Sequence, residues 1–257
     1  MVNCVILLIM EHIKKIKNEL KSNGYVVIKG FFSEIKEFKD FNLFLKKFIR
    51  FSLREKNNKI KKFDKALILK FKKNKKISSF LNDTINLSPS LNLLLSSNKL
   101  ISQLSKIFGE KKEKIILNNT RFRIQIPGND DIANLPWHQD SHYNLIKNTQ
   151  SIVAWVSLSN INKKMGPIIF KKGSHKFGSQ KKNLIKKANG GTAYKVNFNK
   201  PYLKNLKNIQ LETQAGDLIL IDMNTIHTSG VNMTDDKIKY SAQARYHVVK
   251  SILLDKN

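Results

Sequence analysis

Apolar residues recur every three or four positions through the first hundred residues, which is the spacing of one face of an α-helix. The clearest stripe consists of Ile13, Ile16 and Leu20, and an Asn-Gly turn signal follows it. We therefore expect residues 10–110 to be mainly helical.

Two further signals divide this helical part. Residues 25–28 read Tyr-Val-Val-Ile and predict a short buried strand. A second helix is expected to begin near Ser33, because serine is a favoured N-cap residue. A third covers residues 100–108 and is stopped by Gly109.

The densest run of positive charge extends from Lys56 to Lys76. Within it, Ile60, Phe63, Leu67 and Phe71 fall at helical spacing. This pattern predicts an amphipathic helix with lysines on its outer face. It is also the surface on which we would expect an acidic partner to bind.

From about residue 114 the pattern changes to short apolar segments separated by turn residues, which predicts antiparallel strands in a sandwich or barrel. The clearest strands cover residues 115–126, 151–159, 167–171, 218–221 and 239–249. The stretch 178–201, rich in Lys, Asn and Gly, is expected to be a long surface loop over the site. We find no internal repeat, so the whole chain, 1–257, is interpreted as one domain, with residues 111–250 as its β core.

One predicted strand carries polar residues on one face, namely Arg121, Arg123 and Gln125, with apolar residues between them. Such a face is either solvated and tied by structural ion pairs, or it lines a wet interior pocket. In the second case Arg121 or Arg123 would meet an anionic group.

The formal net charge of +28 at first suggests a nucleic-acid partner. However, the excess of basic residues is spread over both halves of the chain, and only five of the 47 are arginine, the preferred reader of phosphates and base edges. Lys, Asn and Ile are abundant throughout, as in proteins from genomes rich in A and T. We attribute the charge to a solvated surface and do not expect nucleic-acid binding.

The single cysteine, Cys4, excludes an internal disulfide and suits a reducing cytoplasm. The apolar run from Cys4 to Met10 is far shorter than a membrane span and lacks the features of a signal peptide. We therefore expect a cytoplasmic protein without a membrane span, for which Met1 and Met10 are both possible starts. The sequence carries no signal of oligomeric state.

The candidate chemistry lies in two separated segments. His138 and Asp140 are two residues apart, so on a strand they would project from the same face. His227, which follows the apolar strand 218–221, is the best candidate for a third ligand. Two histidines and one carboxylate form the facial triad of non-haem Fe(II) oxygenases, although an isolated His-x-Asp is a weak signal.

Several motifs in a fixed order strengthen this interpretation. They are Trp-His-Gln-Asp at 137–140, Gly-Pro at 166–167, Gly-Ser-His at 173–175, Ala-Gly-Asp at 215–217 and His-Thr-Ser-Gly-Val-Asn-Met-Thr at 227–234. This arrangement resembles the phytanoyl-CoA dioxygenase family of Fe(II)/2-oxoglutarate-dependent oxygenases. The resemblance extends over nearly the whole chain.

The resemblance implies a mainly β, α+β fold, a double-stranded β-helix (jelly roll) with the N-terminal helices packed outside. It also implies that His138, Asp140 and His227 hold Fe(II), with 2-oxoglutarate and O₂ as co-substrates and succinate and CO₂ as co-products. Halogenating relatives replace the carboxylate ligand with a small residue. A chain that keeps Asp140 is thus expected to hydroxylate a small organic or acyl substrate.

The family usually binds the distal carboxylate of 2-oxoglutarate with an arginine eleven residues after the last histidine, which here is Ile238. With one extra residue in the preceding turn, Lys239 takes this position. Lysine offers a point charge where arginine offers a two-pronged contact, so weaker co-substrate affinity is expected. Arg245, on the same strand face, lies too far along the strand to be the same anchor and would support the site.

Other residues match pocket positions of the family less closely. Ser229, Trp155 and Gln139 are expected near the co-substrate. His142 is a candidate for substrate contact beside Arg121 and Arg123, whereas His175 is expected to be structural.

Two other functions stay open. One is a non-catalytic basic protein on the same scaffold that uses the Lys56–Lys76 patch. The other is a nucleic-acid demethylating oxygenase, although its second arginine and base-flipping lid are not recognisable here.

Overall fold

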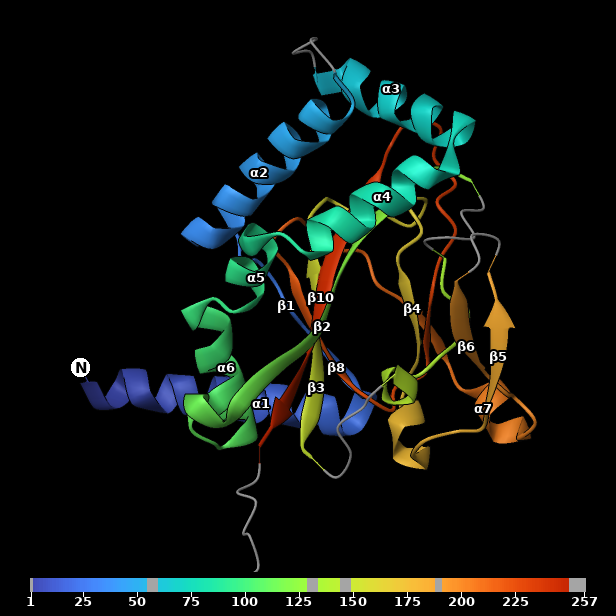
Figure 1. Ribbon diagram of the computed structural model, residues 1–257. Helices are drawn as coiled ribbons and strands as arrows, with labels where there is room; N and C mark the ends of the chain where they lie inside the picture. Colours follow the sequence, from blue (N-terminus) through green and yellow to red (C-terminus); the bar gives the residue numbers. More distant parts are fainter. Residues whose placement is uncertain (1, 55–59, 129–133, 144–148, 188–190, 250–257) are drawn as a thin grey trace, which may run out of the picture.

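The computed structural model describes residues 2–54, 60–128, 134–143, 149–187 and 191–249. Its N-terminal part is built from helices that lie along one side of the molecule and cover one face of a central sheet (Figure 1). These helices are α1 (Val2–Asn23), α2 (Lys36–Ser52), α3 (Ile60–Lys73), α4 (Lys75–Asn86), α5 (Pro89–Leu95) and α6 (Asn98–Phe108).

The helix ends follow from local chemistry. Ser88 caps α5 by accepting a hydrogen bond from the backbone N–H of Leu91 at 3.2 Å, and Pro89 occupies the first turn. Gly109 ends α6 in the left-handed conformation, as the sequence indicated. The expected N-cap at Ser33 is wrong, because α2 begins at Lys36 and Ser33 lies in the preceding turn.

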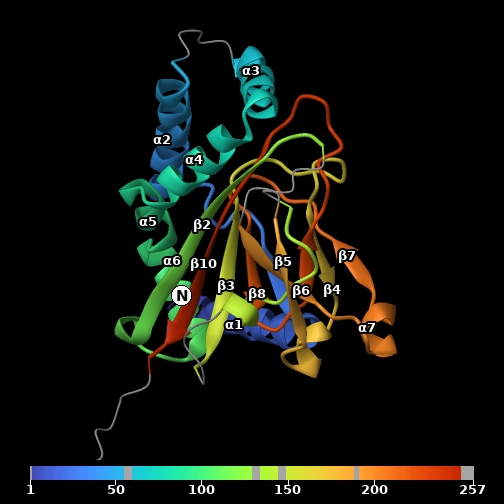
Figure 2. The same cartoon turned by 45° about the vertical axis from the view of Figure 1, so that its right-hand side comes forward.

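The central sheet has the strand order β1-β8-β3-β10-β2, and every neighbouring pair is antiparallel. Figure 2 shows β2, β10, β3 and β8 side by side, with α4, α5 and α6 to their left. Their bounds are β1 (Tyr25–Ile28), β2 (Ile115–Gln125), β3 (Ser151–Ser157), β8 (Leu218–Asp222) and β10 (Lys239–Val248). All five coincide closely with strands predicted from the sequence.

A smaller sheet, in the order β7-β4-β9, and a separate hairpin, β5-β6, complete the strands of the described chain. The bounds are β4 (Ile168–Lys171), β5 (Lys182–Lys186), β6 (Thr192–Val196), β7 (Asn208–Gln210) and β9 (His227–Ser229), with short helices η1 (Lys112–Lys114), η2 (Asp140–Tyr143), η3 (Ser174–Phe177) and α7 (Pro201–Asn205). The expected long loop at 178–201 is therefore wrong. It contains a hairpin, whose lysine-rich strand β5 is mostly exposed and lacks an apolar signal.

The central sheet separates two apolar clusters through the two-residue period of its strands. Ala154 and Leu220 face the helices and pack in the larger cluster with Phe41. Trp155 and Ile219 face the opposite way and pack toward the smaller sheet. The fold is thus a mixed helical and sheet structure with mainly antiparallel sheets, and the space between the two sheets is available for a site.

The predicted lysine-rich helix is divided, because α3 ends at Lys73 and α4 begins at Lys75. Leu67 and Phe71 are buried as expected, whereas residues 55–59 and the side chains of Ile60 and Phe63 lie outside the described part of the chain. Within that part, no helix has both the length and the apolarity that a bilayer span requires.

Candidate metal centre and adjoining cavities

The three predicted ligands meet between the two sheets. One ligand atom from each of His138, Asp140 and His227 lies within 4.8 Å of the others, and all three residues are buried. The expected strand at 138–140 is wrong. His138 instead forms a single antiparallel bridge with His227, and Asp140 begins the short helix η2.

Both imidazole rings are held by backbone carbonyls. His138 Nδ1 lies 2.7 Å from the carbonyl oxygen of Pro136, and His227 Nδ1 lies 2.9 Å from that of Thr225. A carbonyl only accepts, so each Nδ1 carries a proton and each Nε2 is the ring nitrogen left for a metal. Such carbonyl contacts are the usual means of orienting metal-binding histidines.

Asp140 has two different oxygens. Arg245 donates a hydrogen bond to Oδ1, and the two residues form a buried ion pair. Oδ2 is buried without a hydrogen-bond partner and lies 3.5 Å from His227 Nε2. A buried oxygen without a donor is rare unless an ion or a water completes it. The donor set of two imidazoles and one carboxylate therefore fits a divalent metal.

The protonation states agree with this fit. Burial, together with the neighbouring His227, lowers the pKa of His138 to about 3, so this ring is neutral at physiological pH. Burial raises the pKa of the Asp140 carboxyl, but Arg245 and the two neighbouring histidines together outweigh this effect and lower the pKa to about 2. At neutral pH both groups are thus in the forms that bind metals.

A narrow cavity of about 30 Å³ extends from the two histidines to Lys239. Trp155 and Ser229, which the sequence predicted near the co-substrate, both line it. The Lys239 ammonium donates a hydrogen bond to the carbonyl of Gly166, and burial followed by the charge of Arg123 lowers its pKa to about 7. The ammonium has three donors, so two remain for a ligand carboxylate beside that carbonyl.

Two predicted site residues, Gln139 and His142, do not line the narrow cavity. The amide of Gln139 donates to the carbonyls of Gly178 and Asn224 and accepts from the N–H of Gln180, which makes it a structural brace. His142 Nε2 bonds to the carbonyl of Gln180 at 2.9 Å. The sequence could not separate these residues from His138 because they share its segment. His175 also contacts backbone, through Nε2 and the carbonyl of Lys21.

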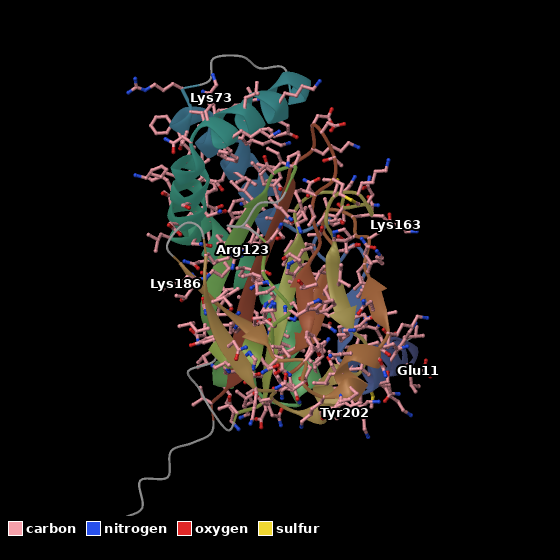
Figure 3. The ribbon with its side chains drawn as sticks, turned by 90° about the vertical axis from the view of Figure 1, so that its right-hand side faces the viewer. Glu11, Lys73, Arg123, Lys163, Lys186 and Tyr202 are labelled. Carbon is pink, nitrogen blue, oxygen red and sulfur yellow. The ribbon has the colours of Figure 1, made fainter. Side chains whose placement is uncertain are left out.

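A wider cavity of about 450 Å³ lies on the Asp140 side of the cluster and is lined by Arg121, Arg123 and Arg245. Arg123 also lines the narrow cavity, so the two share a wall. In Figure 3 Arg123 lies within the outline of the molecule, whereas Lys163 lies at its edge.

The sequence did not indicate several residues of the wider cavity. Asn82 and Asn86 come from α4, Tyr143 comes from η2, and Lys187 and Thr192 come from the β5-β6 hairpin. The spacing of the two asparagines, four residues apart on one helix face, is the one local signal that could have suggested a shared role.

The model of the protein family described as phytanoyl-CoA dioxygenase matches residues 20–239 of this chain. No curated protein sequence gives a significant match. Among solved structures, the epimerase SnoN in complex with Fe3+, alpha ketoglutarate and nogalamycin RO has a TM-score of 0.64 at 16% identity, over 93% of this chain and 84% of that one.

Two further structures have similar scores. EvdO2 from Micromonospora carbonacea var. aurantiaca, complexed with 2-oxoglutarate, has a TM-score of 0.58 at 15% identity, over 94% of this chain and 93% of that one. The carbocyclase SnoK from nogalamycin biosynthesis has a TM-score of 0.57 at 13% identity, over 91% and 83%. At these identities the comparisons establish a shared fold.

Proposed function

The chain belongs to the phytanoyl-CoA dioxygenase family, and we propose that it is a non-haem iron oxidoreductase that uses 2-oxoglutarate. The observation that carries this proposal is the buried His138–Asp140–His227 cluster, whose ligand atoms lie within 4.8 Å of one another. Fe(II) is the metal and 2-oxoglutarate the co-substrate, in keeping with the ligands named for SnoN and EvdO2.

We also propose that the two sheets are the halves of a double-stranded β-helix within a single domain. Support comes from the antiparallel pairing throughout both sheets and from the position of the ligands between them. His227 begins β9 of the smaller sheet, and Lys239 begins β10 of the larger one. The metal and the co-substrate would thus lie between the halves.

In this proposal Lys239 binds the distal carboxylate of 2-oxoglutarate, and Ser229 and Trp155 flank the co-substrate. Lys239 is almost fully buried, so its interaction with a carboxylate would be little screened by water. When bound, iron, 2-oxoglutarate and O₂ together supply an oxidant that can attack an unactivated C–H bond, with succinate and CO₂ as co-products.

The chain itself orients the ligands and limits water. The carbonyls of Pro136 and Thr225 hold the imidazoles, while Arg245 fixes Asp140 and leaves Oδ2 free for the metal. The burial of all three ligands keeps bulk water from the reacting centre, which protects a reactive oxidant from side reactions.

Hydroxylation is the outcome we propose, because the carboxylate ligand Asp140 is retained. The structural neighbours include an epimerase and a carbocyclase, so the product must be identified directly. A non-catalytic basic protein is the weaker alternative, since it gives no reason for burying Asp140 Oδ2 without a donor.

The test needs no knowledge of the substrate. The purified apoprotein is titrated with Fe(II) and 2-oxoglutarate without oxygen, and the visible metal-to-ligand charge-transfer band is recorded. We expect a band in the wild type, none in His227→Ala and a weaker apparent affinity in Lys239→Ala. Lys163→Ala, an exposed lysine, is the matched control. A wild-type protein without the band would refute the proposal, and loss of affinity confined to Arg245→Ala would move the anchor away from Lys239.

A further inference from the structure

The wider cavity has the size and position of a substrate pocket for the proposed reaction. Its volume of about 450 Å³ falls in the usual range for small-molecule sites. It is walled by α4, by β2 and β10 and by residues of the β5-β6 hairpin. Arg245 lines it and bonds to Asp140, so the cavity adjoins the metal cluster directly.

The positive charge of this cavity is not balanced by its own residues. Arg245 is already paired with Asp140. Arg121 and Arg123 form no ion pair with a carboxylate in the part of the chain that the structure describes. The one carboxylate among the lining residues is Asp83, which is exposed on α4.

This gathering of positive charge destabilises the charged form of Arg123. Burial, followed by the charges of Arg121 and Arg245, lowers the pKa of its guanidinium to about 10. Like charges gathered at one wall raise the energy of one another, and a bound anion would relieve that repulsion.

The neutral groups of the wall are also arranged as donors. Asn82 Oδ1 accepts from the N–H of Ile124 at 3.0 Å, and Asn86 Oδ1 accepts from the N–H of Phe122. The Tyr143 hydroxyl accepts from the N–H of Tyr194 at 2.9 Å. Each acceptor is therefore occupied by backbone, and the amide NH₂ groups and the phenolic O–H remain to donate to a ligand.

We propose that this cavity binds the substrate through an oxyanion, a carboxylate, a phosphate or a sulfate, held by Arg121 and Arg123. Arginine suits this task because its planar fork can make two parallel bonds to such a group. The asparagine amides and the Tyr143 hydroxyl add donors for further oxygens of the same molecule. That the anion belongs to the substrate rests on the proposed function, whereas the binding site itself does not.

The site is tested by calorimetric titration of the metal-free protein with phenyl phosphate, benzoate and phenol. The two anions should bind and neutral phenol should not. In Arg121→Gln and Arg123→Gln the anion affinity should fall by about tenfold or more, because each variant removes a charged donor. The anion affinity of Arg121→Lys should lie between that of the glutamine variants and that of the wild type. Arg54→Gln, which removes an exposed arginine at the end of α2, should stay within about twofold.

Several results would overturn the proposal. An equal loss of anion affinity in Arg54→Gln would show that the anions are attracted generally to a basic protein. A loss of anion affinity confined to Lys239→Ala would place the anions in the narrow cavity. Equal binding of phenol, or no binding of either anion, would also refute it. Arg121 is exposed, so Arg121→Gln is expected to fold, and its melting temperature checks this.

The charge-transfer band separates this proposal from the proposed function. Arg121→Gln should keep the band with Fe(II) and 2-oxoglutarate while losing anion affinity. A wild type that forms the band but binds no anion would refute the oxyanion site and leave the proposed function standing. A wild type that binds the anions but never forms the band would refute the oxygenase and leave the oxyanion site. The ratio of phenyl phosphate to benzoate affinity indicates which acid the site prefers.

Discussion

At the scale of single residues, the site depends on how each polar atom is occupied. Asp140 Oδ1 is held by Arg245, and Oδ2 has no hydrogen-bond partner. The Nδ1 atoms of His138 and His227 are tied to carbonyls. Asp140 Oδ1 and the two Nδ1 atoms thus have partners, whereas Oδ2 is left without a hydrogen-bond donor.

We expect Arg245→Met to weaken Fe(II) binding by roughly 10- to 100-fold, the usual cost of removing a group that orients a ligand. Without the guanidinium, the buried Asp140 carboxyl loses its ion pair and its pKa rises. Anaerobic titration with Fe(II) alone measures the effect, with Arg54→Met as the surface control. Equal affinities in the two variants would contradict the role given to Arg245.

Lys239 makes co-substrate binding dependent on pH. Its pKa is lowered to about 7, so the side chain is fully protonated well below that value and loses its charge as the pH rises through it. Carboxylate binding needs the ammonium, and 2-oxoglutarate affinity should therefore fall roughly tenfold per pH unit above about pH 8. The midpoint of the charge-transfer titration between pH 6.5 and 9 measures this. Lys239→Arg should abolish the pH dependence of 2-oxoglutarate affinity. A wild-type pH profile as flat as that of the variant would contradict the prediction.

At the scale of elements, close backbone contacts between turns hold the two sheets together around the site. Gly166 has a φ of +67°, and a Cβ there would lie 2.5 Å from the carbonyl oxygen of Gly230 and 2.8 Å from Asn232 N. These atoms are backbone, so no side-chain rotation relieves the clash. The backbone carbonyl of Gly166 also accepts the hydrogen bond from the Lys239 ammonium.

Gly166→Ala should lower the free energy of unfolding by about 2–4 kcal/mol, because left-handed strain adds to overpacking. Gly109→Ala is the control, since Gly109 has a φ of +71° but nothing within 4 Å of the added Cβ. That variant should lose only about 1 kcal/mol. Urea unfolding of both variants makes the comparison, and equal losses would show that the clash is relaxed by backbone movement.

At the scale of the whole molecule, the charge of +28 is spread over the surface rather than gathered at the metal cluster. The exposed lysines of α3 lie at the end of the molecule formed by α2 and α3 (Figure 1), with Lys73 labelled there in Figure 3. The proposed metal and co-substrate site uses instead two buried cations, Lys239 and Arg245.

Replacing Lys65, Lys72 and Lys73 with Gln should therefore leave both the charge-transfer band and the phenyl phosphate affinity within about twofold of the wild type, because exposed charges are screened over about 10 Å. Spectroscopic and calorimetric titrations at 0.15 M salt check this. Loss of either property would give the lysine-rich face a part in the function and favour the basic-protein alternative.

Much of this protein was readable from local patterns. Period-two alternation predicted β2, β3 and β10, short apolar runs predicted β1 and β8, and Gly109 marked the end of α6. The ordered motifs gave the family, which the match over residues 20–239 establishes. These features depend on neighbours in sequence, so the sequence by itself determined them.

Only the tertiary structure decided how distant segments meet. Arg245 reaches Asp140 across 105 residues. Residues of α4 and of the β5-β6 hairpin form walls of the wider cavity, and the spacing of Asn82 and Asn86 is the one local sign of that role. Gln139, adjacent to a candidate ligand, is turned to brace backbone instead. Side-chain direction and cavity shape follow from long-range packing, which no local periodicity encodes.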